Sequence, residues 1–284
     1  MSIGKQHKKR LRRFYLFAFD MILPSVIMIF ILLIGSNTKT GNYATVNGIK
    51  MYYETYGSGK PLLLIHGNGG SVQSMRDQIS FFAKNYKVIA ADSRGQGKTI
   101  DTGDSLTYDM IADDLYALLI KLKIDSAYIL GHSDGGIIGL RLAIKYPKKV
   151  KMLAAVAPNI RPDSAVLYPE VETDIKQTMV RLTHLVKQGY KDSISKLKLT
   201  LLMINHPHIS TAELSTIQAP VLIMSGDRDA ILLSHITEIF MAIPKSQLCV
   251  LPGSTHFALW QNTKVFNEAI ELFFTKPFEM PNSF

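Results

Sequence analysis

One stretch decides the fold: SAYILGHSDGG, at residues 126–136. A short apolar run ends there in the motif GHSDG, residues 131–135, and a helical pattern begins at once. The motif G-x-S-x-G between a strand and a helix is typical of a nucleophile elbow. Because the turn is so tight, only glycine fits at the outer motif positions, Gly131 and Gly135. The turn lifts the hydroxyl of Ser133 above the sheet edge. The stretch therefore predicts a nucleophilic serine; the alternative is a tight strand–helix turn around an inactive one.

Strand-like and helix-like patterns alternate along the rest of the chain. YATVNGIKMYYETYG, residues 43–57, is typical of a hairpin that turns at Asn47-Gly48. Residues 107–123 have the apolar spacing of a helix, capped by Thr107. The other expected strands cover residues 61–67, 86–92, 126–133, 150–158, 219–227 and 246–253, and the other expected helices cover 72–84, 135–146, 234–243 and 262–274. Apolar strands that alternate with helices predict an α/β fold, a mostly parallel central sheet covered by helices on both faces.

A serine hydroxyl needs a base to take its proton, so a histidine must reach the elbow. Of the eight histidines, His256 lies in GSTHF, residues 253–257, after the last expected strand. Only this loop leaves a strand end with a helix after it, so His256 is the candidate general base. A carboxylate must then orient the imidazole. Asp227 and Asp229 compete after the preceding strand, and Asp229 is favoured because the chain has by then turned out over the sheet.

The chain order Ser133, Asp229, His256, with these positions at strand ends, resembles the α/β-hydrolase fold family over residues 43–275. The likeness is to serine hydrolases of the esterase and lipase type. In that family the acid loop commonly reads G-x-x-D, which residues 226–229 match. The resemblance implies that these three side chains form a catalytic triad.

The family's H-G-x-G loop after the first parallel strand is matched by HGNG at residues 66–69. By this resemblance, the backbone amides of Asn68 and Asp134 form the oxyanion hole, whose donors are worth about 3–4 kcal/mol each. The family's D-x-R-G-x-G turn is matched by DSRGQG at residues 92–97, where structural work is expected. Dehalogenase and epoxide-hydrolase relatives use an aspartate nucleophile, but the flanking glycines centre on Ser133. Asp134 is therefore expected to contribute only its backbone amide.

The resemblance implies a serine hydrolase that cleaves a carboxylic ester or related acyl bond of a small molecule through an acyl-enzyme. An ester is favoured because an alcohol leaves more easily than an amine. Amidase, carbon–carbon bond hydrolase, acyltransferase and cofactor-free haloperoxidase activities stay open. A non-catalytic ligand-binding module with the same fold also stays open.

No cofactor and no metal are expected. No Gly-x-Gly-x-x-Gly follows a strand, and the single cysteine, Cys249, excludes a cysteine-cluster metal site. Cys249 is expected to be a small core residue. His206 and His208 have no acidic or cysteine partner nearby in the sequence and are assigned to a surface loop.

Residues 159–217 break the alternation, because they contain helical patterns but no strand pattern. They have the length of the family's helical cap. An apolar stripe is formed by Ile175, Met179, Leu182, Leu185 and Val186. Most of it is expected to pack against the main domain, and the rest to line an acyl or aromatic pocket. Seven Lys and Arg against six Asp and Glu give no indication of an ionic substrate.

The net charge of +9 is concentrated at the start of the 284-residue chain. Six Lys or Arg residues lie within residues 1–13 without one acid, which leaves +3 for the other 271 residues. This distribution argues against nucleic-acid binding. The segment 1–13 is expected to be a basic cytoplasmic tail.

FYLFAFDMILPSVIMIFILLIG, residues 14–35, would span about 33 Å as a helix, enough for a bilayer core of about 30 Å. We expect an uncleaved signal anchor despite Asp20 and Pro24, with the N-terminus in the cytoplasm and the hydrolase domain outside it. The alternative is a cleaved signal peptide and secretion. Residues 36–42 are expected to be a polar linker to a hydrolase domain at 43–284.

Overall fold

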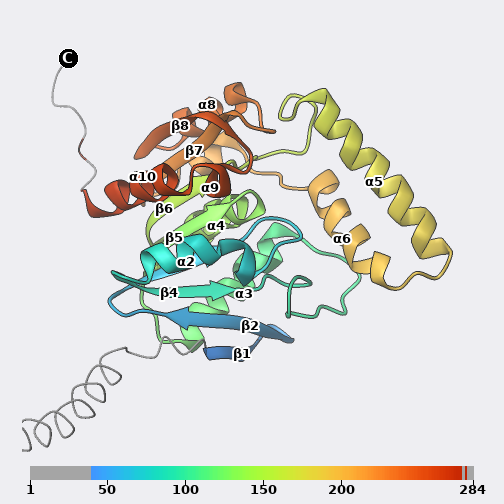
Figure 1. Cartoon of the computed structure of the whole chain (residues 1–284), viewed down its shortest axis with the longest axis horizontal. Helices are drawn as coiled ribbons and strands as arrows, with labels where there is room; N and C mark the ends of the chain where they lie inside the picture. Colours follow the sequence, from blue (N-terminus) through green and yellow to red (C-terminus); the bar gives the residue numbers. More distant parts are fainter. Residues whose placement is uncertain (1–39, 277–278, 280–284) are drawn as a thin grey trace, which may run out of the picture. The chain divides into compact units, whose positions relative to one another are not determined.

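The computed structural model describes residues 40–276 and residue 279 (Figure 1). The expected tail and transmembrane segment lie outside these residues. The described residues belong to one compact unit. Within that part, no helix is both long and apolar enough to cross a membrane.

The described residues form a mostly parallel sheet of eight strands, as the alternating pattern predicts. Its strands are β1 (Thr40–Val46), β2 (Ile49–Tyr56), β3 (Lys60–Ile65), β4 (Tyr86–Ala91), β5 (Ala127–His132), β6 (Val150–Val156), β7 (Val221–Arg228) and β8 (Ser246–Thr255). Their order across the sheet is β1-β2-β4-β3-β5-β6-β7-β8. β2 is antiparallel to both β1 and β4, and every other neighbouring pair is parallel.

The first two strands form the predicted hairpin. Val46 pairs with Ile49, and the two turn residues between them have positive φ, 42° at Asn47 and 80° at Gly48. Asparagine and glycine adopt this backbone region more readily than other residues, so the Asn-Gly pair fixes the turn and the register.

Helices cover both faces of the sheet (Figure 1). α2 and α10 contact each other on one face, and α3 packs beside α4 on the other. Thr107 caps α3 as predicted, because its side chain accepts a hydrogen bond from the Met110 backbone amide. Outside the insertion described below, the helices are η1 (Val72–Met75), α2 (Arg76–Phe82), α3 (Tyr108–Lys121), α4 (Asp134–Lys145), η2 (Pro147–Lys149), α8 (Leu233–Ala242), α9 (Ala258–Gln261) and α10 (Thr263–Thr275).

The core lies between the sheet and these helices. The central strands β3, β5 and β6 are almost wholly buried, as expected of strands covered on two faces. Cys249 differs from its expected place in the core, because it is only half-buried. The reason is that β8 is the last strand of the sheet and has a neighbour on one side only.

Between β6 and β7 the chain forms a helical insertion, which corresponds to residues 159–217. It contains α5 (Pro169–Lys187), α6 (Asp192–Asn205) and the short α7 (Thr211–Leu214). α5 and α6 pack against each other beside the sheet (Figure 1). Of the apolar stripe expected on α5, only Leu182 is fully buried. The other members stay half-buried, because much of this helix borders solvent and a cavity instead of the core.

Candidate active site

The GHSDG motif forms a sharp turn between β5 and α4. Ser133 has φ 56° and ψ −119°, a conformation that side-chain-bearing residues rarely adopt. A Cβ on Gly131 would lie 2.0 Å from the carbonyl oxygen of Gly135, and a Cβ on Gly135 would lie 2.1 Å from that of Ile65. Both positions therefore require glycine, and the turn holds the serine in its strained conformation.

A hydrogen-bonded chain joins the three side chains that sequence analysis selected. His256 Nε2 lies 2.9 Å from Ser133 Oγ, and His256 Nδ1 lies 2.7 Å from Asp229 Oδ1. Because a carboxylate can only accept, Nδ1–H donates to Asp229, and Nε2 is left to accept the serine proton. Asp227, the competing acid, is exposed near the end of β7, two residues before Asp229. The structure brings Ser133, His256 and Asp229 together, although they are far apart in the chain.

Asp229 is buried, with 4% of the residue exposed, and its carboxyl also accepts hydrogen bonds from the backbone amides of Gly226 and Ile231. Burial raises its pKa, but the hydrogen bond and charge of His256, together with the two amides, outweigh burial and leave the pKa below its ordinary value. The carboxylate is therefore ionised at neutral pH and can stabilise an imidazolium at His256.

His132, which precedes the serine in the motif, holds the backbone of His256 in place. Its ring Nε2–H donates to the backbone carbonyl of His256 at 2.7 Å. Burial, followed by the charge of His256, lowers the pKa of His132 to about 4, so this ring is neutral at pH 7. Sequence reasoning placed His132 near the elbow without a role; its position next to Ser133 was the available signal.

The loop after β3 lies against the elbow. A Cβ on Gly67 would come within 3.2 Å of the Ser133 Cβ. Among the described residues, neither the Asn68 nor the Asp134 backbone amide donates to another group of the protein. Two N–H donors close to the serine are thus available to an oxyanion, as the resemblance implies.

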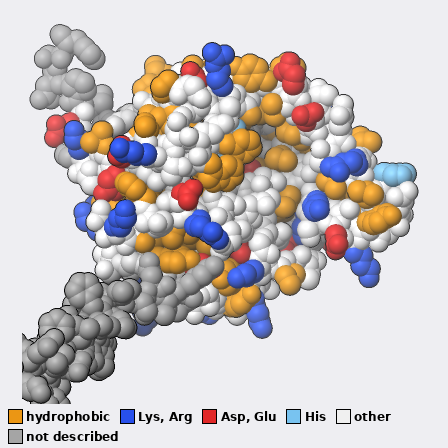
Figure 2. Space-filling view, in the orientation of Figure 1, with side chains coloured by type: hydrophobic (Ala, Val, Ile, Leu, Met, Phe, Trp, Pro, Cys, Tyr) orange, Lys and Arg blue, Asp and Glu red, His pale blue; other side chains and the backbone are white. Residues whose placement is uncertain are grey.

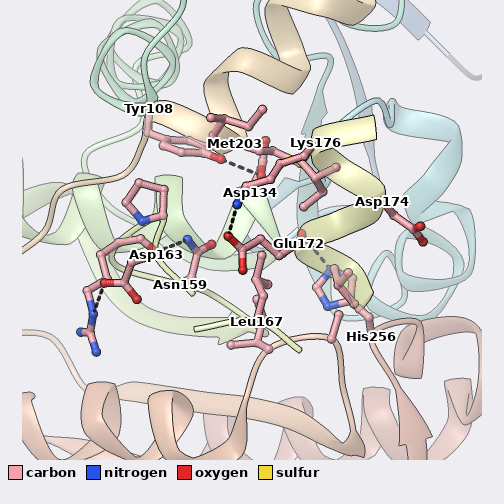
Figure 3. Close-up of a pocket in the computed structure, with 18 of the residues that line it drawn as sticks. Tyr108, Asp134, Asn159, Asp163, Leu167, Glu172, Asp174, Lys176, Met203 and His256 are labelled. Atoms are coloured by element: carbon pink, nitrogen blue, oxygen red, sulfur yellow. Dashed lines mark hydrogen bonds and ion pairs between the residues drawn. The ribbon is translucent and has the colours of Figure 1, made fainter. Parts of the chain in front are cut away.

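The side chain of Asp134 has contacts that sequence analysis missed, since only its backbone amide was expected to matter. The carboxyl is buried and accepts hydrogen bonds from the Asn68 side-chain amide at 2.9 Å and from the Tyr108 hydroxyl at 2.8 Å. Figure 3 shows the contact with Tyr108. The Asn68 amide also donates to the carbonyl of Leu199 in α6, at 3.2 Å. The candidate oxyanion loop is therefore tied both to the elbow and to the helical insertion.

The D-x-R-G-x-G turn, residues 92–97, forms hydrogen bonds with the HGNG loop at residues 66–69. The Gln96 side chain accepts the Gly69 backbone amide at 2.7 Å, and the Ser93 amide donates to His66 Nε2 at 3.0 Å. His66 is buried, and its burial lowers the pKa, so the ring is held neutral. These contacts fix the start of the oxyanion loop without reaching the serine.

A cavity of about 460 Å³ opens above Ser133 and His256 (Figure 3). It lies where α5 and α6 face the elbow, and its volume is in the range of small-molecule sites. Most of its lining surface is apolar. The larger apolar side chains are Leu167, Val171, Ile175, Met203, Ile204, Ile231 and Phe257.

An aromatic pair lies beside the cavity. Phe257 and Trp260 stack with ring centroids 5.4 Å apart, and each exposes about half of its surface, 49% and 47%. Figure 2 shows a hydrophobic patch over α9, the short helix that carries Trp260. Since Phe257 also lines the cavity, this patch continues the apolar lining out to the surface.

Within residues 40–276 and 279, no group of three or more His, Cys, Asp or Glu is placed to hold a metal ion. His206 and His208 lie with ring centroids 5.7 Å apart on the loop after α6. The pair has no third ligand of these types in that part of the chain.

Comparison with known proteins decides the family. A sequence model of the alpha/beta hydrolase fold matches residues 60–190, which contain both the elbow and the oxyanion loop. The chain belongs to the α/β-hydrolase fold family. Solved structures agree on the fold of this α/β hydrolase. A thermophilic esterase from Thermogutta terrifontis superimposes with a TM-score of 0.67 and 23% identity, over 85% of this chain and 100% of that one.

Two curated relatives show how far the likeness extends. The α/β hydrolase is 28% identical over 218 residues to a 2-hydroxy-6-oxo-6-(2'-aminophenyl)hexa-2,4-dienoic acid hydrolase of Metapseudomonas resinovorans, which covers 73% of this chain and 72% of that protein. It is 31% identical over 115 residues to the uncharacterized hydrolase YraK of Bacillus subtilis, which covers 40% of this chain. In that second match it spans less than half of the relative, 42%.

Proposed function

We propose that this α/β hydrolase cleaves a carboxylic ester with Ser133 as the nucleophile. The observation that carries the proposal is the continuous hydrogen-bonded chain from Ser133 Oγ through His256 to Asp229. His256 Nε2 takes the hydroxyl proton while Oγ attacks the carbonyl carbon. Asp229 keeps the imidazole in the required tautomer and stabilises its charged form.

The two free backbone amides complete the proposed reaction. Those of Asn68 and Asp134 hold the negative oxygen of the tetrahedral intermediate. His256 then protonates the leaving alkoxide, so the acyl group stays on Ser133. A water activated by His256 attacks this acyl-enzyme and restores the serine, which releases the carboxylic acid.

The helical insertion is proposed to act as a cap that lines the substrate site. Support comes from the cavity, since Val171 and Ile175 of α5 and Met203 and Ile204 of α6 form part of its lining. An apolar acyl chain bound there would displace water and bury its surface against these side chains.

A second candidate activity is carbon–carbon bond hydrolysis of a dienoic acid. It is supported by the Metapseudomonas resinovorans relative, which matches nearly three quarters of this chain. Both reactions use a nucleophile–base pair and an oxyanion site, so the triad alone does not separate them. They differ in the substrate, because the dienoic acid carries a free carboxylate and a simple ester does not.

The proposed function is tested with the Ser133→Ala variant and p-nitrophenyl butyrate. Turnover is expected to fall at least about 10³-fold, because the covalent pathway needs the hydroxyl. Labelling by a fluorophosphonate probe should disappear as well. Ser234→Ala, an exposed serine of α8, is the matched control and should keep both properties. Undiminished turnover in Ser133→Ala, or a wild-type protein that the probe does not label, would overturn the assignment.

We also propose that residues 14–35 anchor the protein in a bilayer, with the hydrolase domain on the extracytoplasmic side. The support is the length and apolarity of this segment and the six basic residues that precede it. Membrane association that resists carbonate extraction and is lost on deletion of residues 1–35 is the expected result. A mature N-terminus near Asn37 would instead establish cleavage and secretion.

A further inference from the structure

The charged side chains of the cavity show which substrates it can accept. Two cations line it, Arg161 and Lys176, together with the acids Asp134, Asp163, Glu172 and Asp174. A cavity that recognises a carboxylate needs a cation whose charge is not already neutralised by an acid, since burying an unpaired anion is strongly unfavourable. Whether the two cations are already paired with acids therefore decides between neutral and anionic substrates.

Arg161 is already occupied by two acids. Its Nη1 and Nη2 atoms donate to the two carboxylate oxygens of Glu238 in α8, at 2.6 and 2.8 Å. Its Nε lies 2.9 Å from Asp163 Oδ2. All three guanidinium nitrogens thus face carboxylates, and two negative charges surround one positive charge. The hydrogen bonds from Arg161 also lower the pKa of Glu238, so that acid remains ionised.

Lys176 is paired one helical turn away on α5, where its ammonium donates to Glu172. The lysine side chain is 64% exposed and the glutamate side chain 28%, so the acid is the more buried partner. In Figure 3 the Glu172 carboxylate lies among the central residues, whereas Asp174 points away from them. The inner part of the cavity therefore presents a neutralised ion pair where a carboxylate-binding site would present an unpaired cation.

We propose that this cavity selects esters whose acyl chain is uncharged and rejects substrates that carry a free carboxylate, dienoic acids among them. Of the described residues that line it, neither cation is without an acidic partner, and the remaining surface is mainly apolar. An uncharged acyl chain contacts Leu167, Val171 and Ile175, and its burial removes no charged group from water. A carboxylate at the same place would lose its water and meet Glu172 and Asp163.

The selectivity rests on the proposed ester hydrolysis, and the experiment separates the two. The probes are the p-nitrophenyl monoester of adipic acid and its neutral methyl ester, which have the same chain length. For the wild-type protein, kcat/KM should be about 100-fold higher for the neutral ester, because like charges in a binding site strongly disfavour the anion. Failure to hydrolyse either ester would instead contradict the proposed function.

Glu238→Gln supplies the decisive comparison. Glu238 lies outside the cavity lining, and its loss would release the bidentate face of Arg161. The ratio of the two kcat/KM values should fall about tenfold, since a freed guanidinium binds carboxylates well. Glu172→Gln, at a partly exposed helix position, should lower the ratio too and serves if the first variant does not fold. A wild-type ratio within about threefold of one, or a ratio unchanged in both variants, would overturn the proposal.

Discussion

The side-chain amide of Asn68 donates to the Asp134 carboxylate at 2.9 Å, so the two residues with free backbone amides beside the serine are also joined through their side chains. The same amide nitrogen reaches the Leu199 carbonyl of α6. Position errors of about 1 Å can cost as much as 10²-fold in rate. This bridge therefore sets the oxyanion loop relative to both the elbow and the insertion.

Asn68→Ala keeps the backbone N–H but removes the bridge. We expect kcat for p-nitrophenyl butyrate to fall about 10–100-fold with a smaller change in KM, because the lost positioning acts mainly in the transition state. Asp134→Ala should have a similar effect. Since the Asn68–Asp134 contact is lost in either single variant, the double variant should lose less than the product of the two single losses. Asn85→Ala, an exposed asparagine, is the control. Multiplying losses in the double variant would show that the two side chains act separately.

The end of β7 and the loop after it offer two aspartates for comparison, Asp227 and Asp229. Asp229→Asn should lower kcat about 10³–10⁴-fold, because an amide can present N–H to His256 Nδ1 and favour the wrong tautomer. Asp227→Asn changes an exposed side chain near the end of β7 and should stay within about twofold of wild type. Steady-state kinetics on both variants, with thermal melting to check the fold, make the comparison. A larger loss at position 227 would move the acid's role to that residue.

Much of the fold could be predicted because local patterns carry it. The Asn47-Gly48 pair fixes the first hairpin, and Thr107 marks the start of α3. Apolar runs give the central strands, since a parallel sheet is buried on both faces. Cys249 shows the limit: its strand was recognised, but not the position of that strand at the sheet edge. Burial there depends on strand order, which one strand's sequence does not encode.

The site was predictable where chemistry dictates residue type and position, as for Ser133 and the histidine after the last strand. Contacts between distant segments were not. The charges of the insertion nearly balance in sequence, yet in space Arg161 is paired with Glu238, which lies outside the insertion. The Asp134 carboxyl likewise meets partners 66 and 26 residues away. Such pairings depend on the completed fold.

The elbow glycines give a stability test. In Gly131→Ala, the new Cβ would meet the Gly135 carbonyl oxygen, which belongs to the backbone and cannot swing aside. We expect a loss of about 1–3 kcal/mol in the free energy of unfolding, as for other overpacked sites, or failure to fold. Gly48→Ala meets nothing within 4 Å but has φ 80°, so it should cost about 1–2 kcal/mol from backbone strain alone. Urea denaturation of both variants measures the difference, and Gly131→Ala with wild-type stability would contradict the crowding between Gly131 and Gly135.

His132 makes stability depend on pH. Its pKa is about 4 in the folded protein against 6.5 for an ordinary histidine, so above pH 6.5 the ring is neutral in both states and stability is complete. As the pH falls from 6.5 toward 4, the unfolded chain binds a proton that the folded chain does not. The free energy of unfolding then falls by about 1.4 kcal/mol per pH unit, or roughly 3 kcal/mol across the window.

His132→Gln separates this effect from the other buried histidines. Glutamine can still donate an N–H to the His256 carbonyl, but it does not titrate. Urea unfolding at pH 7.5 and pH 4.5 should therefore show a drop in stability smaller by about 2–3 kcal/mol in the variant than in the wild type. His66 is present in both proteins, and burial is the largest cause of its lowered pKa, so most of its contribution cancels in the comparison. Equal drops in the two proteins would mean that the His132 ring takes up its proton as readily in the folded state as in the unfolded chain.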